Sequence, residues 1–446
     1  MATSILERGV RGLRPPSGPE ARVDPRRPSA DVAAILRGQG DARALELDLP
    51  CGPVLHLVNT RDISDVARDW RCFATPPQLV PLEGVLLPLS RPEGGAGPLG
   101  GRLSTSDRAA RRAYRAAGAW LAKQLAHRSG HPTDIQALAR TAALDATARV
   151  ALAHGPAGRF SPAGPASRST LEAMQRALDA ALPATAAAGI GAPVGGQLAG
   201  AVEEIEREIY AAIAGREGGT LVAEGDADLL SALLAGGPPG ERPPEKFRRT
   251  RAELLPAMTT STLAVSHLVA ATLLALAQRP SRQQRAHDEA GGRPAASAYT
   301  AACVIETLRL SPPVPTVYLG CVRSTLVGPF RVDAGSSVAL SVRAAQQDPR
   351  SGVWERPSAW VPERWTQGGS AGTEAAARMA GALVPLGAGV ACGLDRLELI
   401  AGAAEMVGAV VNSVELGAVR GWEPHVQEAV LPWSANGVLV RARGRS

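Results

Sequence analysis

The sequence predicts a mainly α-helical protein with a small β region. Apolar residues recur with helical periodicity over most of the chain from Ser104 onward. Alternation typical of strands is confined to short pairs, one near residue 50 and one near residue 335. The stretch 247–277 is apolar on nearly all sides, and such a helix must be central and buried. Together these observations favour a helical fold built around that segment.

The composition is that of a globular protein. The chain has 446 residues, and 45% of them are hydrophobic, which is enough to bury a sizeable core. Residues 1–30 are rich in Pro, Arg and Gly and are expected to form a loose arm, while 31–446 are expected to form a single domain. The net charge of +6 is small, the arginines are spread and aromatics make up only 3%, so we expect no nucleic-acid partner.

The cysteines and the N-terminus indicate a reducing compartment. The cysteines form no CxxC pair and no short regular spacing, which argues against a disulfide framework or a structural zinc site. The first residues contain no apolar run long enough for a signal peptide or a membrane anchor. We therefore expect a cytoplasmic protein without a membrane anchor. The cysteines are Cys51, Cys72, Cys303, Cys321 and Cys392.

Caps, turns and periodicity predict the elements of the first half. The turn Pro50–Pro53 joins two alternating segments. Ser104–Asp107 is typical of a helix N-cap and precedes a long periodic run. Segments rich in Gly and Pro separate the helices. The expected strands are 45–49 and 54–58, and the expected helices are 33–37, 62–70, 104–127, 134–152, 171–181 and 197–214.

Two arginines on the helix 104–127 are candidates for anion binding. Arg111 and Arg115 lie one turn apart and share a face. Such a pair either faces solvent or holds an anion between its two cations.

The central helix 247–277 carries a proline and a polar cluster at its middle. Pro256 is followed by Thr259, Thr260, Ser261 and Thr262. Because proline kinks a helix and hydroxyls can rebond the freed carbonyls, we expect a local opening that admits a ligand. The alternative is a kinked core helix without an opening.

Glu306 and Arg309 are spaced i, i+3 on a predicted helix, 300–310, which ends at Ser311-Pro312-Pro313. A pair of this kind on an apolar helix is expected to be buried, where it needs further hydrogen-bond partners. Arg364, in a loop flanked by tryptophans, is the candidate for completing it. Between these features two strands are expected, 330–332 and 337–342.

A Gly-rich loop, 385–393, delivers Cys392 to the start of a predicted helix at 394–411. Glycines allow close backbone approach to a flat ligand, and a helix N-terminus favours a thiolate. Cys392 is therefore a candidate axial metal ligand. The alternative is a buried cysteine that acts as a small hydrophobe.

The order of these features resembles the cytochrome P-450 superfamily of haem-thiolate proteins, from residue 100 to the C-terminus and more weakly back to residue 30. Glu306, Arg309 and Arg364 look like its Glu-Arg-Arg triad. The resemblance implies a triangular helical prism with a small β region. It also implies haem b (iron protoporphyrin IX) between the central helix and the cysteine loop, with Cys392 as the proximal thiolate.

The resemblance also assigns site residues. Ala257 and Ser261 or Thr262 would lie over the iron, and an alcohol and an acid would relay protons to dioxygen. Thr260 stands at the position of the acid. Arg111 or Arg115 would pair with a haem propionate. The cofactor loop would include Leu386, Gly387, Gly389 and Gly393.

The chain departs from the family pattern at these sites. Leu386 replaces the phenylalanine that shields the sulfur, and the loop is one residue short before Cys392. Met258 replaces a glycine on the central helix. Leu319 replaces a propionate-binding arginine, with Arg323 nearby as a substitute. These losses affect haem affinity and proton delivery more than the fold.

Two functions follow from the resemblance. The first is a soluble bacterial-type monooxygenase, an oxidoreductase of secondary metabolism that inserts oxygen into an apolar small molecule. Its electrons would come from NAD(P)H through a separate ferredoxin and ferredoxin reductase. The second is a protein that keeps the fold without oxygen activation, either a haem isomerase, dehydratase or cyclase, or a haem-poor partner of another enzyme.

Overall fold

The computed structural model of the chain describes the following residues: 44–49, 52–76, 108–152, 196–217, 229–366 (except 239, 293 and 294), 382–384 and 396–445 (except 429 and 430), together with Val32 and Ile35. The predicted helix 171–181 and the cysteine loop lie outside them.

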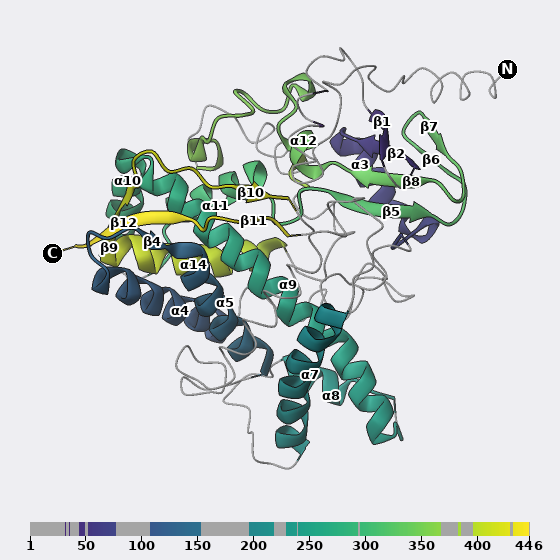
Figure 1. Cartoon of the computed structure of the whole chain (residues 1–446), viewed down its shortest axis with the longest axis horizontal. Helices are drawn as coiled ribbons and strands as arrows, with labels where there is room; N and C mark the ends of the chain where they lie inside the picture. The colour runs from purple at the N-terminus through teal and green to yellow at the C-terminus, as the bar shows by residue number, and fades with distance from the viewer. Residues whose placement is uncertain are drawn as a thin grey trace.

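The fold is mainly helical, with small sheets (Figure 1). This confirms the fold class predicted from the sequence. The α-helices are α3 (Thr60–Arg68), α4 (Arg108–His127), α5 (Ile135–Leu152), α7 (Gly196–Glu217), α8 (Leu229–Ala235), α9 (Pro243–Ala277), α10 (Pro280–Ala290), α11 (Ala298–Leu310), α12 (Val342–Gln346) and α14 (Arg396–Ser413). Short 3-10 turns follow at Trp70–Cys72, Pro349–Ser351 and Pro362–Trp365.

The strands form four small sheets among the described residues. A five-stranded sheet has the order β1-β2-β8-β5-β3, in which only β2 and β8 are parallel. It lies on the opposite side of the molecule from α4 and α5 (Figure 1). The strands of this sheet are β1 (Ala44–Leu49), β2 (Gly52–Leu57), β3 (Phe73–Ala74), β5 (Val317–Cys321) and β8 (Ser337–Leu340). The other sheets pair β4 (Thr133–Asp134) and β9 (Val414–Ala418) with β12 (Leu439–Gly444), β6 (Thr325–Val327) with β7 (Phe330–Val332), and β10 (Val426–Gln427) with β11 (Trp433–Ser434).

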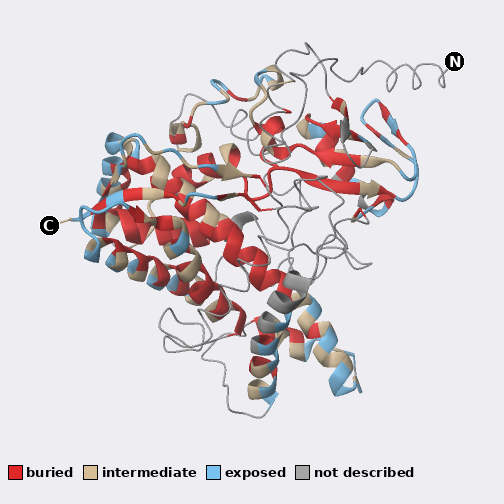
Figure 2. Cartoon of the chain, viewed as in Figure 1, coloured by how far each residue is buried: buried red, intermediate tan, exposed pale blue. Residues whose placement is uncertain are grey.

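Helix α9 is the centre of the helical part, and it packs against α5, α7, α11 and α14. Figure 2 shows it buried along most of its length and exposed at its N-terminal end. Among the described residues it is the one helix long and apolar enough to cross a membrane, but 78% of its most apolar window is buried inside the protein. That is the pattern of a core helix, as predicted.

The expected opening at Pro256 is absent, because α9 continues as one α-helix from Pro243 to Ala277. Thr259 Oγ1 donates to the carbonyls of Leu255 (2.9 Å) and Pro256 (3.3 Å). Hydroxyl bonding to the preceding turn and burial on all sides hold the helix together across the proline. The helix thus has no opening, as the alternative expected, and it is continuous through the proline.

Glycines bring α4 and α14 into close contact. A Cβ atom on Gly118 would lie 2.6 Å from the Cα atom of Met406, and one on Gly402 would lie 2.9 Å from the Tyr114 ring. Any larger residue at either position would push the helices apart. This packing fixes α14, the helix that follows the cysteine loop, against α4.

Candidate functional site

Glu306 lies at the centre of a buried network. Its Oε1 accepts hydrogen bonds from Arg309 Nη2 (2.8 Å), the Val361 amide (2.9 Å) and Arg364 Nε (3.1 Å). Its Oε2 accepts from Arg309 Nε (3.0 Å) and Trp365 Nε1 (2.9 Å). The side chains of Glu306 and Arg309 are fully buried, and that of Arg364 is 9% exposed. The three charged residues that the sequence grouped together therefore meet. Both carboxylate oxygens of Glu306 have hydrogen-bond partners, which a buried charge requires.

The rest of Arg309 ties this network to the segment before the cysteine loop. Its Nη1 donates to the carbonyls of Gln346 (2.9 Å) and Pro357 (2.7 Å), and its Nη2 donates to that of Ala359 (3.1 Å). Gln346 Nε2 donates to the Arg309 carbonyl (3.0 Å), and its Oε1 accepts from the Val384 amide (3.0 Å). Sequence reasoning missed Gln346, because its partners lie 37 and 38 residues away.

The predicted loop residues Leu386, Gly387, Gly389, Cys392 and Gly393 all lie outside the described residues. The segment before them is fixed at Val384, and the helix after them begins at Arg396. The described segments on either side of the loop are therefore anchored, Val384 to the Glu306 network and α14 to α4.

Two of the described cysteines, Cys303 and Cys321, are poor candidates for a thiolate ligand. Burial raises the pKa of both thiols, which disfavours the charged form. Cys72 Sγ–H donates to Asp69 (3.1 Å), and its sulfur accepts from Arg323 Nη2 (3.2 Å). All three are free and buried.

The predicted distal residues lie on α9, and all are buried: Ala257 is 7% exposed, Thr260 1%, Ser261 6% and Thr262 0%. Thr262 Oγ1 is a buried hydroxyl to which no described residue hydrogen-bonds. A buried hydroxyl without a partner is costly, so its presence in the middle of a core helix needs an explanation.

Arg111 and Arg115 both reach a carboxylate that sequence reasoning missed. Arg115 Nε donates to Glu405 Oε2 (3.0 Å), and Arg111 Nη1 lies 3.9 Å from Glu405 Oε1. Glu405 is only 4% exposed and comes from α14. The two arginines thus share an anion, as one alternative expected, but the anion is a protein side chain. A lone carboxylate in the apolar run 399–411 was the available signal.

Leu319, at the position of the propionate-binding arginine, and the nearby Arg323 both contact other parts of the protein. Leu319 is buried in β5, where it pairs with Val338 of β8. Arg323 donates to the sulfur of Cys72, as described above, and lies close to the charge of Asp69. Arg323 is therefore held at the edge of the five-stranded sheet.

Comparisons with known proteins agree on one family. A model of the cytochrome P450 family matches residues 108–391. Cytochrome P450 137 of Mycobacterium tuberculosis is 31% identical over 168 residues, which are 36% of this chain and 33% of that protein. The 2-hydroxyisoflavanone synthase of Glycine max is 31% identical over 94 residues, 20% of this chain and 18% of the relative. The matched segments thus span a third or less of these curated relatives.

A solved structure supports the same assignment at the level of the fold. The haem domain of a cytochrome P450DA mutant aligns with a TM-score of 0.74 at 16% identity, over 97% of each chain. The family model covers well over half of this sequence, and the same fold extends over nearly all of it. The chain therefore belongs to the cytochrome P450 family.

Proposed function

We propose that the chain is a haem-thiolate monooxygenase that inserts oxygen into an apolar small molecule. The observation that carries this proposal is the buried alcohol cluster at the middle of α9, with Thr262 Oγ1 lacking a partner among the described residues. A hydroxyl left without a partner at the centre of a protein is explained if a bound group or its substrate supplies one. Family membership supplies the reaction class.

The described residues fit haem on the α9 side. Ala257 is small and buried, and the unpartnered hydroxyl of Thr262 lies less than two turns further along the helix. Cys392 would hold the metal, as the family resemblance implies, and burial disfavours the thiolate form of Cys303 and Cys321 by raising their pKa. When bound through a thiolate, haem supplies the activation of dioxygen.

The residues of this chain would bind and deliver protons. Ser261 and Thr262 are the alcohols that would hand on a proton, while Thr260 cannot replace a carboxylic acid because its hydroxyl does not titrate near neutral pH. Leu386, Gly387, Gly389 and Gly393 would surround the sulfur of Cys392. Exclusion of bulk water follows from the burial of the cluster.

The contacts with Glu405 distinguish the two arginines that could bind a haem propionate. Arg115 makes the shorter contact with Glu405, so Arg111, whose contact is longer and whose side chain is 52% exposed, is the better candidate for binding a propionate. Arg suits this role because its planar guanidinium matches a carboxylate.

We further propose that electrons come from NAD(P)H through a separate ferredoxin and ferredoxin reductase, and that the protein is a cytoplasmic enzyme of bacterial secondary metabolism. The scattered cysteines, which lack the spacing of an iron–sulfur cluster, support separate electron carriers. The name of the curated mycobacterial relative supports a bacterial origin only by analogy.

One observation favours the second candidate, a P450 fold without oxygen activation. Arg111 and Arg115 contact Glu405, and Arg323 contacts Cys72, so each basic residue that the sequence offered to the propionates has a protein partner. A charge-assisted hydrogen bond is worth about 1.5–3 kcal/mol, so the loss of such bonds would weaken haem binding by orders of magnitude.

The absorption spectrum of the reduced, carbon-monoxide-treated protein separates the two candidates. The monooxygenase predicts the strongly red-shifted Soret band of a thiolate-ligated haem. A haem-replete protein without that band would remove the first candidate. Purified protein that takes up no haem at all would favour the haem-poor partner.

A further inference from the structure

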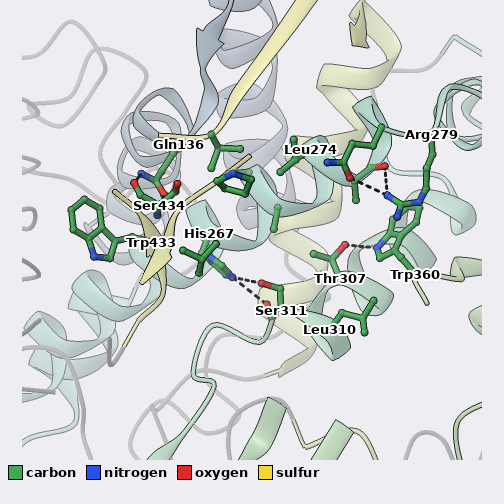
Figure 3. A pocket seen from close by; sticks show the side chains of 17 residues that line it. Gln136, His267, Leu274, Arg279, Thr307, Leu310, Ser311, Trp360, Trp433 and Ser434 are labelled. Carbon is green, nitrogen blue, oxygen red and sulfur yellow. Dashed lines mark hydrogen bonds between the residues drawn. The ribbon is translucent and has the colours of Figure 1, made fainter. Parts of the chain in front are cut away.

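A pocket lies apart from the alcohol cluster at the middle of α9. This cavity of about 250 Å³ opens between the C-terminal half of α9, the end of α11 and the β10–β11 hairpin (Figure 3). Its lining on α9 begins at His267 and ends at Ala275, and Gln278 and Arg279 follow just beyond the helix. At 1.5 Å per residue, His267 lies about 7.5 Å along the helix from Thr262. None of the residues assigned above to haem or to proton delivery lines this pocket.

The walls of the pocket suit a flat, apolar ring. Ala270, Ala271, Leu274 and Leu310 form aliphatic sides, and two indoles, Trp360 and Trp433, add planar surfaces. The guanidinium carbon of Arg279 lies 5.0 Å from the centroid of the Trp360 ring and holds that indole in place. Small binding sites typically combine such walls with a few fixed polar groups.

Several polar groups of the lining already have partners. Thr307 Oγ1 donates to the Cys303 carbonyl (2.9 Å) and accepts from Trp360 Nε1 (3.0 Å). Gln136 Nε2 donates to the Ser434 carbonyl (3.0 Å), and its Oε1 accepts from the Ser434 amide (2.8 Å). These groups shape the pocket, but their hydrogen bonds are already made within the protein, so we do not assign them to a ligand.

His267 presents an acceptor. Its Nε2 lies 3.2 Å from the Ser311 carbonyl oxygen and 3.0 Å from Ser311 Oγ. A carbonyl only accepts, so Nε2 carries the hydrogen and Nδ1 keeps a lone pair. No described residue hydrogen-bonds to Nδ1. Burial lowers the pKa of His267 to about 4, so this imidazole is neutral near pH 7.

Trp433, at the same end of the pocket as His267, carries a second buried polar group. Its Nε1–H is buried, and it has no hydrogen-bond partner among the described residues. Figure 3 shows Trp433 and His267 on the opposite side of the pocket from Trp360. The pocket therefore offers an acceptor at His267 and apolar surface on its other walls. A hydroxyl group can donate to that acceptor.

We propose that this pocket binds a small aromatic alcohol, whose hydroxyl donates to His267 Nδ1 while its ring packs between the apolar walls. The site is separate from the proposed haem site, and occupation of one does not require residues of the other.

Titration calorimetry with two matched probes tests the proposal on the protein as purified. Naphthalen-2-ol can donate to His267, whereas 2-methoxynaphthalene has the same ring system and an acceptor oxygen but no donor. We expect the alcohol to bind about tenfold more tightly, the ratio that corresponds to one net hydrogen bond. His267→Phe keeps an aromatic ring at this position. It should weaken the binding of naphthalen-2-ol alone and so remove the difference in affinity between the two probes. Equal affinities in the unsubstituted protein would overturn the proposal.

A second variant guards against misfolding. Ala271→Phe fills the pocket while it retains His267, and it should abolish binding of both probes. Thermal unfolding shows that each variant still folds. Unchanged affinity for naphthalen-2-ol in both variants would place the probe elsewhere and contradict the proposal.

The haem site needs its own control. Ala257→Phe obstructs the space beside the alcohols of α9 and should leave binding of naphthalen-2-ol unchanged, with no shift of the Soret band on titration. Binding lost in that variant, or accompanied by a Soret shift, would assign the probe to the haem site instead. Because calorimetry needs no haem, a protein that proved haem-poor would refute the monooxygenase and leave this test valid.

Discussion

The Glu306 network and the alcohol cluster of α9 are both buried and polar, but they differ in how fully they are bonded. The two oxygens of Glu306 accept hydrogen bonds from three side chains, on α11 and the 3-10 turn Pro362–Trp365, and from one backbone amide. Thr262 Oγ1, equally buried, has no partner among the described residues. A closed network, in which every polar group has a protein partner, stabilises the fold. An open polar group, which has no such partner, can hydrogen-bond to a bound ligand instead.

The closed network around Glu306 also reaches the segment that precedes the cysteine loop. Through Gln346 it fixes the Val384 amide, eight residues before Cys392. The alcohol cluster lies on the helix expected to face that cysteine. The network fixes the segment that precedes the loop, and we propose that α9 supplies the chemistry, so substitutions should separate the two by their effects on stability and on turnover.

The largest expected effect is on stability at Glu306. Glu306→Gln removes the anion between two arginines and leaves Arg309 buried without it, which should cost about 3–5 kcal/mol of unfolding free energy. Denaturant unfolding measures this. Asp333→Asn, which breaks an exposed pair with Arg331, is the matched control and should cost less than about 1 kcal/mol. Equal effects of the two substitutions would mean that the buried network is not the scaffold.

Gln346→Met should cost less, about 2 kcal/mol. It leaves the Val384 amide and the Arg309 carbonyl without their partner while keeping a similar volume. Because Val384 precedes the cysteine loop, we also expect faster loss of haem to an acceptor such as apomyoglobin. Lower stability with an unchanged rate of haem loss would separate the network from the loop.

Two threonines on α9 sharpen the comparison further. Thr259→Val removes a hydroxyl that donates to the Leu255 carbonyl and should cost about 1 kcal/mol. Thr262→Val removes a hydroxyl without a described partner, so its stability should change by less than about 0.5 kcal/mol. Its effect should instead be on coupling, with more peroxide released per NAD(P)H consumed. A Thr262→Val protein that loses stability as strongly as Thr259→Val would show that its hydroxyl is structural.

Restoring an acid on α9 should give the smallest change. Thr260→Asp introduces a carboxyl where proton delivery expects one and should raise the fraction of electrons that reach product by about severalfold. The measurement is product formed per NAD(P)H consumed. Thr260→Asn is the isosteric control and should not raise it. If neither variant changes this ratio, protons reach the site by another route.

The sequence predicted the closed network better than the open site. Glu306 and Arg309 share a helix, so their spacing alone pairs them, and a tryptophan-flanked Arg364 was a natural third partner. The strands β1 and β2 also followed from local alternation around a Pro-Gly turn. Local patterns thus sufficed where the partners lie close in sequence or on one element.

Long-range partners were not predictable in this way. The anion between Arg111 and Arg115 is Glu405, which lies 290 residues from Arg115. Helix α9 stays continuous at Pro256 because packing on all sides outweighs the local cost of proline. The pocket between α9, α11 and the β10–β11 hairpin combines residues from Gln136 to Val438, and only the fold brings them together.

The central claim is that Cys392, and no other cysteine, provides a thiolate to haem. The most direct test compares the reduced, carbon-monoxide-treated spectra of Cys392→Ser and Cys303→Ser, because burial raises the pKa of Cys303 and keeps it a thiol. We predict that the red-shifted Soret band disappears in Cys392→Ser and persists in Cys303→Ser. A band that survives in Cys392→Ser would contradict the account.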